Sequence, residues 1–252
     1  MKISVLTGLA ALSAGLLLAN GAGAATNLVK NGSFSASTHG AGELSYNTNV
    51  TDWSVLSASK DKSYDFLFTS GHQATTSGSV GNQGVVKLYG AIPNSPDGGN
   101  FIAVDPAYQN DGPITQTIKG LVAGDSYVLS FDYAGAQQQG FSGKTTEGWT
   151  VDLGDAAAQS TPILSDMSHG FTGWDTASFT FVADASTEVL SFLAKGGPTG
   201  AQPPFALLDG VSLTQQMTGG VPEPGTWALM IMGFGGVGAA VRLRRKRTVA
   251  TA

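Results

Sequence analysis

Turn-forming residues interrupt this chain so often that long helices are excluded from most of its length. Its 252 residues include 35 glycines and 10 prolines. Segments 93–99 (PNSPDGG), 110–113 (NDGP) and 196–198 (GGP) are typical of turns, because Gly adopts positive φ angles and Pro fixes φ. Between residues 26 and 216 no stretch keeps a helical spacing of apolar residues over about a dozen positions. The sequence therefore predicts an all-β region.

The segments between the turns carry the two-residue alternation of half-buried strands. Tyr127, Leu129, Phe131 and Tyr133 occupy every second position, which places them on one face of a strand. The predicted strands cover residues 64–69, 84–89, 101–104, 114–118, 127–133, 149–153, 176–182, 189–194 and 205–214. Many short strands without an internal repeat favour a β-sandwich, which we assign to residues 26–216. The chain has no cysteine, so this fold uses no disulfides.

The charges are unevenly distributed along the chain. The formal net charge is −5, yet acidic residues well outnumber lysines between residues 26 and 221. All arginines lie in a basic tail at the C-terminus, which consists of Arg242, Arg244, Arg245, Lys246 and Arg247. The acidic middle region argues against nucleic-acid binding. The basic tail follows an apolar stretch directly, so we interpret it as a membrane-topology signal.

The N-terminus has the pattern of an export signal. Met1 and Lys2 supply a short positive start, and residues 3–18 are apolar or small without any charge. Residues 22–24 (AGA) then form a small-residue cleavage site. The sequence predicts a signal peptide over residues 1–25, cleaved after Ala24 or Ala25. The alternative is a retained membrane anchor, for which the apolar run is short.

The C-terminus combines a short motif, an apolar segment and a basic end. A linker over residues 217–221 leads to the motif, whose defining residues are Pro222, Glu223, Pro224, Trp227 and Ala228. We expect residues 227–243 to form a single transmembrane helix, at the short limit for a bilayer crossing. Gly residues are tolerated in such helices, Trp227 would lie at the interface, and the basic tail would stay cytoplasmic.

These three parts, in this order over residues 222–247, resemble the PEP-CTERM sorting signal and its PEPxxWA variant. The resemblance implies a Gram-negative protein that crosses the inner membrane, is held there as a precursor and is recognised by exosortase, a membrane cysteine protease/transpeptidase. It further implies release or display at the cell surface, in an exopolysaccharide or biofilm context. A plain tail anchor is the alternative, and it predicts a mature protein that keeps its basic tail.

The β region resembles the galactose-binding-like jelly roll of several carbohydrate-binding modules. The resemblance rests on residues 27–34 (NLVKNGSF), on 114–132 and on the closing segment 205–213 (FALLDGVSL). It implies a jelly-roll sandwich that binds sugars, with a structural Ca²⁺ for which Asn31 and Asp209 are the matching positions. Ser35 stands where this family usually has an acidic residue. An alternative reading of Asp209 is a turn-capping residue.

Signatures of catalysis are missing from the sequence. Residues 138–145 end like a phosphate-binding loop, but Gln138 occupies the position of its first required Gly. His39, His72 and His169 are far apart in sequence and none lies in a zinc-binding motif. We therefore predict a protein that is not an enzyme. A secreted polysaccharide-acting enzyme with a carboxylate pair remains the alternative, as does a structural coat protein without a ligand.

Aromatic residues are the best candidates for ligand binding. Sugar rings stack on Trp and Tyr faces, and Gln or Asp side chains bind their hydroxyls. On this basis the predicted ligand-binding residues are Trp53, Trp149, Trp174 and Gln138. For any one Trp the alternative is packing in the core. Because an acidic domain repels an acidic polymer, a neutral polysaccharide is the expected partner.

Overall fold

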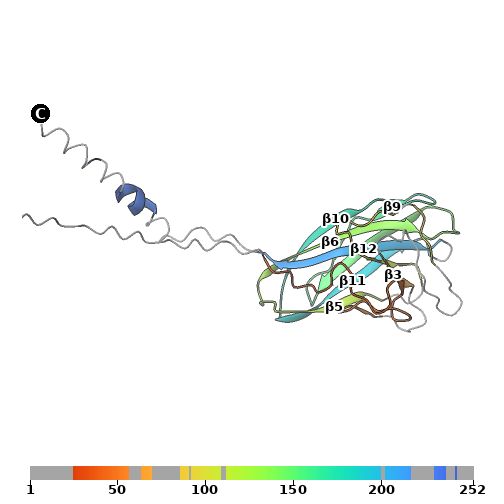
Figure 1. The fold of residues 1–252 in the computed structure, drawn as a ribbon, viewed down its shortest axis with the longest axis horizontal. Coiled ribbons are helices and arrows are strands. Elements are labelled where there is room, and N and C mark those ends of the chain that lie inside the picture. Colours follow the sequence, from red (N-terminus) through yellow and green to blue (C-terminus); the bar gives the residue numbers. More distant parts are fainter. Residues whose placement is uncertain are drawn as a thin grey trace, which may run out of the picture.

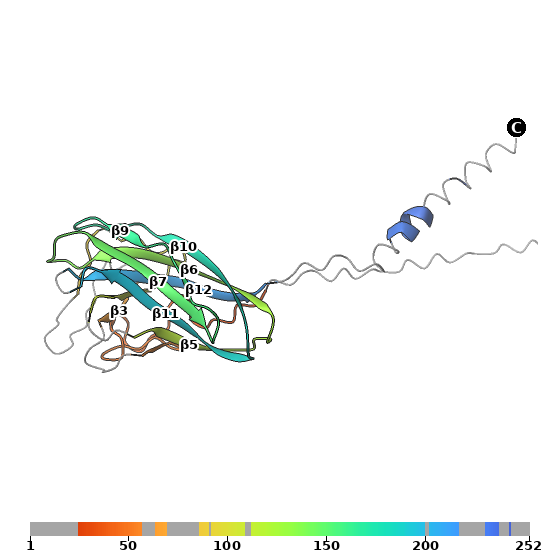
Figure 2. The same cartoon turned by 180° about the vertical axis from the view of Figure 1, so that it is seen from behind.

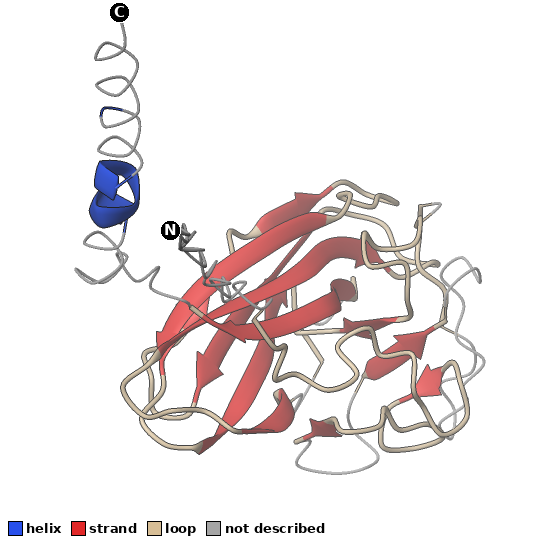
Figure 3. Ribbon diagram, turned by 60° about the vertical axis from the view of Figure 1, so that its left-hand side comes forward, coloured by secondary structure: helices blue, strands red, loops and turns tan. Residues whose placement is uncertain are grey.

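The computed structural model describes residues 25–56, 64–69, 86–90, 92–108, 112–199, 202–216, 230–236 and 242. Its β region consists of two antiparallel sheets that pack face to face (Figures 1 and 2). This arrangement confirms the all-β sandwich predicted from the sequence. Figure 3 shows that the described secondary structure before the tail consists of strands joined by loops and turns.

The first sheet has six strands in the order β1-β3-β4-β12-β6-β10. Its strands are β1 (Gly42–Glu43), β3 (Asp65–Phe68), β4 (Phe101–Val104), β12 (Pro204–Gln215), β6 (Ser126–Gln137) and β10 (Asp175–Val182). The long strands β6 and β12 lie at its centre and pair in opposite directions, from Pro204 opposite Gln137 to Gln215 opposite Tyr127. These two strands therefore define the long axis of the sheet and its two ends.

The second sheet covers one face of the first. Its strands are β2 (Ser54–Val55), β5 (Ile114–Lys119), β11 (Thr187–Gly197), β7 (Thr145–Leu153) and β8 (Gln159–Ser160), in that order, while β9 (Leu164–Asp166) also pairs with β7. Thr145 lies directly opposite Asp166 in the β7–β9 pair. This register places the Thr145 and Asp166 side chains next to each other on one face of the β7–β9 pair.

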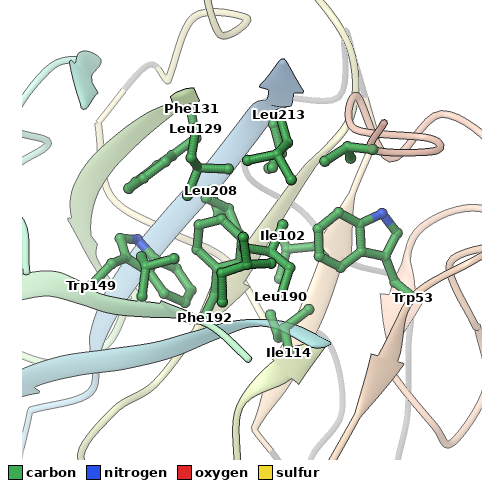
Figure 4. Packing of buried hydrophobic residues seen from close by; sticks show 14 of the residues in the cluster. Trp53, Ile102, Ile114, Leu129, Phe131, Trp149, Leu190, Phe192, Leu208 and Leu213 are labelled. Atoms are coloured by element: carbon green, nitrogen blue, oxygen red, sulfur yellow. The ribbon is translucent and has the colours of Figure 1, made fainter. Parts of the chain in front are cut away.

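The main core lies between the two sheets, and we call it the inner core. Its centre is aromatic: Phe192 of β11 meets Phe131 of β6 edge-to-face at 5.1 Å and Trp149 of β7 at 6.2 Å (Figure 4). Alternate residues of each strand contribute to this core, as the two-residue period requires. Burial of these side chains, at about 25 cal/mol per Å², is the main source of stability.

The opposite face of the first sheet carries a second apolar cluster, which we call the outer cluster. It contains Phe66, Phe101, Ala134, Phe205 and Leu207, which alternate with the residues that face the inner core. Further members come from β3 and its flank, from the segment between β3 and β4, and from β4 and β6: Tyr64, Phe68, Val86, Leu88, Ile92, Ala103 and Ala136. The first sheet is therefore apolar on both faces.

Most strand predictions are confirmed, with differences at their ends. Phe101–Val104 is found as predicted, whereas β6 and β7 extend further, to Ser126–Gln137 and Thr145–Leu153. The predicted strand at 84–89 lies partly outside the described residues, and within it Leu88 forms an isolated bridge with Gln138. The short strands β1, β2, β8 and β9 were not predicted, because two or three residues are too few to show a period.

The tail predictions fall mostly outside the described residues. These include all but the last residue of the predicted signal peptide over 1–25, and the motif residues Pro222, Glu223, Pro224, Trp227 and Ala228. Residues 230–236 are helical and exposed, with Phe234 at 75% exposure. Among the residues that the structure describes, no helix is long and apolar enough to cross a membrane.

The two ends of the β region lie side by side. The backbone N–H of Leu28 donates a 2.8 Å hydrogen bond to the carbonyl of Leu213, and the Asn27 side chain accepts one from the Leu213 N–H at 3.0 Å. Asn27 also forms a bridge with Thr214. The chain therefore enters and leaves the sandwich at the same end, next to the last residues of β12.

Candidate ligand-binding and metal sites

Trp149 is a core residue. Its side chain is 1% exposed, and its indole Nε1–H donates a 3.0 Å hydrogen bond to the buried carbonyl of Leu207 in the facing sheet. A ring without an open face cannot stack on a sugar. The core-packing alternative from the sequence therefore describes Trp149, and the reason is the inward register of β7, in which Trp149 shares a face with Val151.

Trp53 is also largely buried, but it borders a cavity. It is 8% exposed, packs edge-to-face on Phe34 at 5.2 Å, and donates from Nε1 to the carbonyl of Asn31 at 3.1 Å. The cavity has a volume of about 200 Å³ and is lined by Leu44, Ser45, Asn49, Val50, Trp53, Ser54, Val55, Ile102 and Ile114. Ser45, Asn49 and Ser54 are its polar lining residues, and the Trp53 ring itself is largely covered.

Trp174 is half-buried over the outer cluster. Its Nε1–H donates to the carbonyl of Pro93 at 3.1 Å, and its ring meets Phe101 edge-on at 5.6 Å and Phe171 at 6.3 Å. The indole thus fastens the segment before β4 onto the first sheet. Of the three predicted tryptophans it keeps the most exposed surface.

Gln138 belongs to an aromatic and amide group that we call the Tyr108 site. It consists of Tyr64, Tyr108 and Gln138. The rings of Tyr64 and Tyr108 stack with centroids 4.9 Å apart, and the Tyr64 hydroxyl donates to Oε1 of Gln138 at 3.1 Å. Tyr108 is 37% exposed, whereas Tyr64 is buried. The site therefore presents one aromatic face beside a polar amide.

Strand pairing assembles the Tyr108 site. Tyr64 comes just before β3, Tyr108 follows β4, and Gln138 follows β6. Because β3 and β4 are antiparallel, with Asp65 opposite Val104, the start of one meets the end of the other. Sequence reasoning found Gln138 but missed Tyr64, since only this pairing brings residues 44 positions apart in sequence into contact.

Asp105 lies beneath this site and is 3% exposed. Burial raises the pKa of its carboxyl to about 7, although the backbone N–H groups of Ala107 and Tyr108 donate to it and oppose the shift. The bond from Ala107 is 2.8 Å long. Asp105 thus fixes the turn that carries Tyr108, and near neutral pH it exists as a mixture of acid and carboxylate.

A second aromatic pair lies at the same end of the sandwich. The rings of Tyr89 and His169 are 4.3 Å apart, and Nε2 of His169 is 2.8 Å from the Ser142 hydroxyl. Both His169 and Ser142 are exposed, and among the described residues the imidazole has no acidic partner. This pair adds polar surface next to the Gln138 loop.

Asn31 is occupied by its own loop. Its Nδ2 donates to the carbonyls of Ala36 at 2.9 Å and Thr51 at 2.8 Å, while its Oδ1 accepts from the Ala36 N–H at 3.0 Å. The backbone has a positive φ of 50°. The side chain therefore holds the turn between residues 31 and 36, and its oxygen does not fit a metal ligand in this conformation.

Asp209 lies in an acidic group formed with Asp97 and Asp132. It is 0% exposed, accepts a hydrogen bond from the Ser95 hydroxyl, and leaves its Oδ1 without a partner. Burial raises the pKa of Asp209 to about 7, and the nearby charges of Asp97 and Asp132 add to the shift. Ca²⁺ at Asp209 stays a prediction: this oxygen fits it, but within the described ranges no three acidic or His side chains form a metal-binding group.

In the C-terminal part, Arg242 is the only residue of the predicted basic tail that the structure describes, and it is exposed. Residues 220–246 match the PEP-CTERM protein-sorting motif. This match confirms the sorting motif predicted from the sequence. It indicates a protein that is exported and sorted to the cell envelope.

The chain is also similar to individual proteins. It shares 28% identity over 191 residues with halomucin of Haloquadratum walsbyi, which is 75% of this chain and 2% of halomucin. Among solved structures, TmCBM61 in complex with β-1,4-galactotriose has 14% identity and a TM-score of 0.40, covering 76% of this chain and 99% of that one. A CBM4 structure has 18% identity and a TM-score of 0.40, covering 74% and 99%.

Proposed function

We propose that this chain is an exported cell-surface or matrix protein that binds a neutral polysaccharide without turning it over. The observation that carries the proposal is the Tyr108 site, where the partly exposed ring of Tyr108 stacks on Tyr64, whose hydroxyl donates to the Gln138 amide. A sugar ring stacks on such a face through its C–H edges, and the amide binds its hydroxyls. Because the domain is acidic, a neutral polymer meets no like-charge repulsion.

One pair of carboxyls with shifted pKa values, Glu147 and Asp166, bears on the alternative of a polysaccharide-acting enzyme, but it is not open to a polymer. Glu147 and Asp166 are electrostatically coupled, and burial raises the pKa of Glu147 to about 8 and that of Asp166 to about 6. Shifted carboxyls of this kind can serve in glycoside hydrolysis when a substrate reaches them. Here the residues are 0% and 3% exposed, so a glycosidic bond cannot approach them. This burial favours binding over hydrolysis.

The Tyr108 site is tested by replacing its exposed ring. Tyr108→Ala is expected to weaken retention of the exported protein on the producer's own polysaccharide by about tenfold, equivalent to ~1.4 kcal/mol of binding free energy. The loss arises because the stacking face is removed while the inner core is untouched. Affinity electrophoresis in gels with and without the polysaccharide measures the change.

Tyr46→Ala is the matched control for this experiment. Tyr46 is 48% exposed, and none of the aromatic contacts within the described residues involves it. Its loss should leave retention unchanged. Equal weakening by both variants would mean non-specific adsorption, and full retention by Tyr108→Ala would refute the Tyr108 site.

We further propose that the sorting motif is of the PEPxxWA variety and is processed by an exosortase. The proposal rests on the order of Pro222, Glu223, Pro224, Trp227 and Ala228 ahead of the basic tail. In this proposal residues 227–243 anchor a precursor in the inner membrane of a Gram-negative bacterium. Cleavage near the motif then frees the β region to the cell surface, where exopolysaccharide is the available partner.

Processing is tested by mass spectrometry of the mature surface protein. We expect a chain that lacks both the first 24 residues and the basic tail. Replacing Pro222, Glu223 and Pro224 by Ala should leave the precursor in the inner-membrane fraction, because the recognition motif is removed while the apolar segment stays. A mature protein that still contains Arg242 would instead support a plain tail anchor.

A further inference from the structure

A buried polar pocket lies between the sheets, at the end where β7 begins. We call it the carboxylate pocket and define it by Thr145, Glu147 and Asp166. Thr145 and Glu147 are two residues apart on β7, so they share a face, and Asp166 lies directly opposite Thr145 on β9. All three side chains thus point to the same side of the β7–β9 pair. Farther along β7, Trp149 and Val151 on this face enter the inner core.

The two carboxylates of the carboxylate pocket have too few hydrogen-bond donors around them. Thr145, Glu147 and Asp166 are 1%, 0% and 3% exposed. Both carboxylate oxygens of Glu147 and the Oδ2 of Asp166 are buried without a well-formed hydrogen bond; the Thr145 hydroxyl interacts with Glu147 and lowers its pKa in part, and the Met167 N–H donates to Asp166. Such groups cost on the order of 1–3 kcal/mol each when nothing satisfies them. The buried polar groups here comprise two carboxyls and the neutral hydroxyl of Thr145.

Glycines on the surrounding segments make room for the carboxylates. A Cβ at Gly135 of β6 would collide with Oε2 of Glu147, and one at Gly170 would collide with Oδ1 of Asp166. The Thr172 hydroxyl accepts a hydrogen bond from the Gly135 N–H at 2.8 Å and donates its own proton to the carbonyl of Gly173 at 3.0 Å, so it does not supply the missing donor. The pocket therefore accommodates two carboxylates but supplies fewer donors than their oxygens can accept.

The charge of the pocket is also uncompensated. The electrostatic neighbour of Glu147 is Asp166, which carries the same charge. In the described part of the chain no ion pair joins either carboxylate to a Lys, Arg or His side chain. Buried carboxylates in proteins are normally paired or bound to a metal. Two carboxylates and a hydroxyl offer hard oxygen ligands, and the charge of −2 on the carboxylates balances that of one divalent cation.

We propose that Thr145, Glu147 and Asp166 hold a divalent cation of the Ca²⁺ type in the carboxylate pocket. The ligands are carboxylate and hydroxyl oxygens without nitrogen or sulfur, a set that suits Ca²⁺ or Mg²⁺ and disfavours Zn²⁺. The site is separate from Asp209, which lies with Ser95 and Asp132. It does not depend on the proposed polysaccharide binding.

A cation here would brace the end of the sandwich that carries Gln138. Residues 138–144 connect β6 to β7, and the N–H of Gly143 in this loop donates to the Ser168 hydroxyl at 2.9 Å. The same loop is held by Gln137, whose Nε2 donates to the Gly143 carbonyl at 3.1 Å. Fixing Asp166 would hold the segment that carries Ser168, and fixing Thr145 would hold the end of the loop where β7 begins.

The test compares thermal unfolding of the full chain in detergent, after EDTA treatment, with and without added Ca²⁺. Wild type is expected to gain about 5–10 °C in Tm at a hundredfold excess of Ca²⁺ over its Kd. Glu147→Gln and Asp166→Asn keep the shapes of the side chains and should lose this gain. Asp209→Asn is the matched control, a buried carboxyl changed in the same way, and should keep it.

Terbium luminescence locates the ion independently. Tb³⁺ bound beside Glu147 would be sensitised by Trp149, two residues along the same face of β7. We expect this signal in wild type and in Asp209→Asn, and its loss in Asp166→Asn, which also serves if Glu147→Gln does not fold. The proposal is overturned if wild type gains no stability from Ca²⁺, if the gain survives in Asp166→Asn, or if Asp209→Asn alone abolishes it.

Discussion

Raising the pH from about 5 to about 8 in metal-free buffer is expected to destabilise this protein. Burial raises the pKa values of Asp105 and Asp209 to about 7, well above the value of ~3.9 for an unfolded Asp. Between these values the folded state binds more protons than the unfolded state, so stability falls as the pH rises. Once the pH exceeds the folded pKa, the loss is complete.

The size of this effect follows from the shifts. One pKa unit corresponds to ~1.4 kcal/mol, and these carboxyls are almost fully buried, so we expect a total loss of at least ~2 kcal/mol. Urea unfolding at a series of pH values, followed by circular dichroism, measures it. A variant with Asp105→Asn and Asp209→Asn should show a flatter profile, because its neutral amides do not titrate.

The direction of the pH profile is the decisive result. Most proteins gain stability between acidic and neutral pH because their carboxylates are paired in the folded state. A rise in stability from pH 5 to pH 8 in the absence of metal would show that Asp105 and Asp209 are ionised and stabilised in the fold. Added Ca²⁺ should make the fall in stability with pH less steep than in metal-free buffer if it binds Glu147 and Asp166.

Trp149→Ala is expected to cost about 3–5 kcal/mol of unfolding free energy, a large share of the stability of an ordinary domain. The substitution opens a cavity against Phe192 and leaves the buried carbonyl of Leu207 without its donor. The midpoint of urea unfolding should fall accordingly. The exported form is expected to become sensitive to proteases.

Trp149→Phe separates the two causes. It keeps an aromatic ring but removes the Nε1–H, so the expected cost is about 1–3 kcal/mol. The surface substitution Tyr46→Ala should change the stability by less than about 0.5 kcal/mol. If Trp149→Ala and Tyr46→Ala had the same unfolding midpoint, Trp149 would not be part of the core.

The sequence predicts the long strands of this fold well because their side chains alternate. Phe131 and Tyr133 show the two-residue period, and the structure places both in the inner core. Alternation says which residues share a face, but it does not say which face is covered. Trp149 and Trp53 were both candidates for ligand binding, yet the first sheet covers Trp149 and the loop at Asn31 covers most of Trp53.

The candidate sites depend on contacts between distant segments. Tyr64 and Tyr108 meet only because β3 and β4 pair, and no local pattern marks that pairing. Glu147 and Asp166 are ordinary acidic residues in the sequence, where the default expectation is a solvated side chain. Their burial follows from the inward register of β7, a property of the whole sandwich.

The pairing of Asn27 with Leu213 has a mechanical consequence. The chain enters and leaves the β region at one end of β12, whereas Pro204, opposite Gln137, marks the other end. With 12 residues at ~3.3 Å each, β12 is about 36–40 Å long. A domain tethered through its C-terminus is therefore attached at one end of its long axis and presents Gln138 near the opposite end. Neighbouring molecules on the same surface would present their Gln138 ends to one polymer strand, and weak individual contacts would add up through avidity.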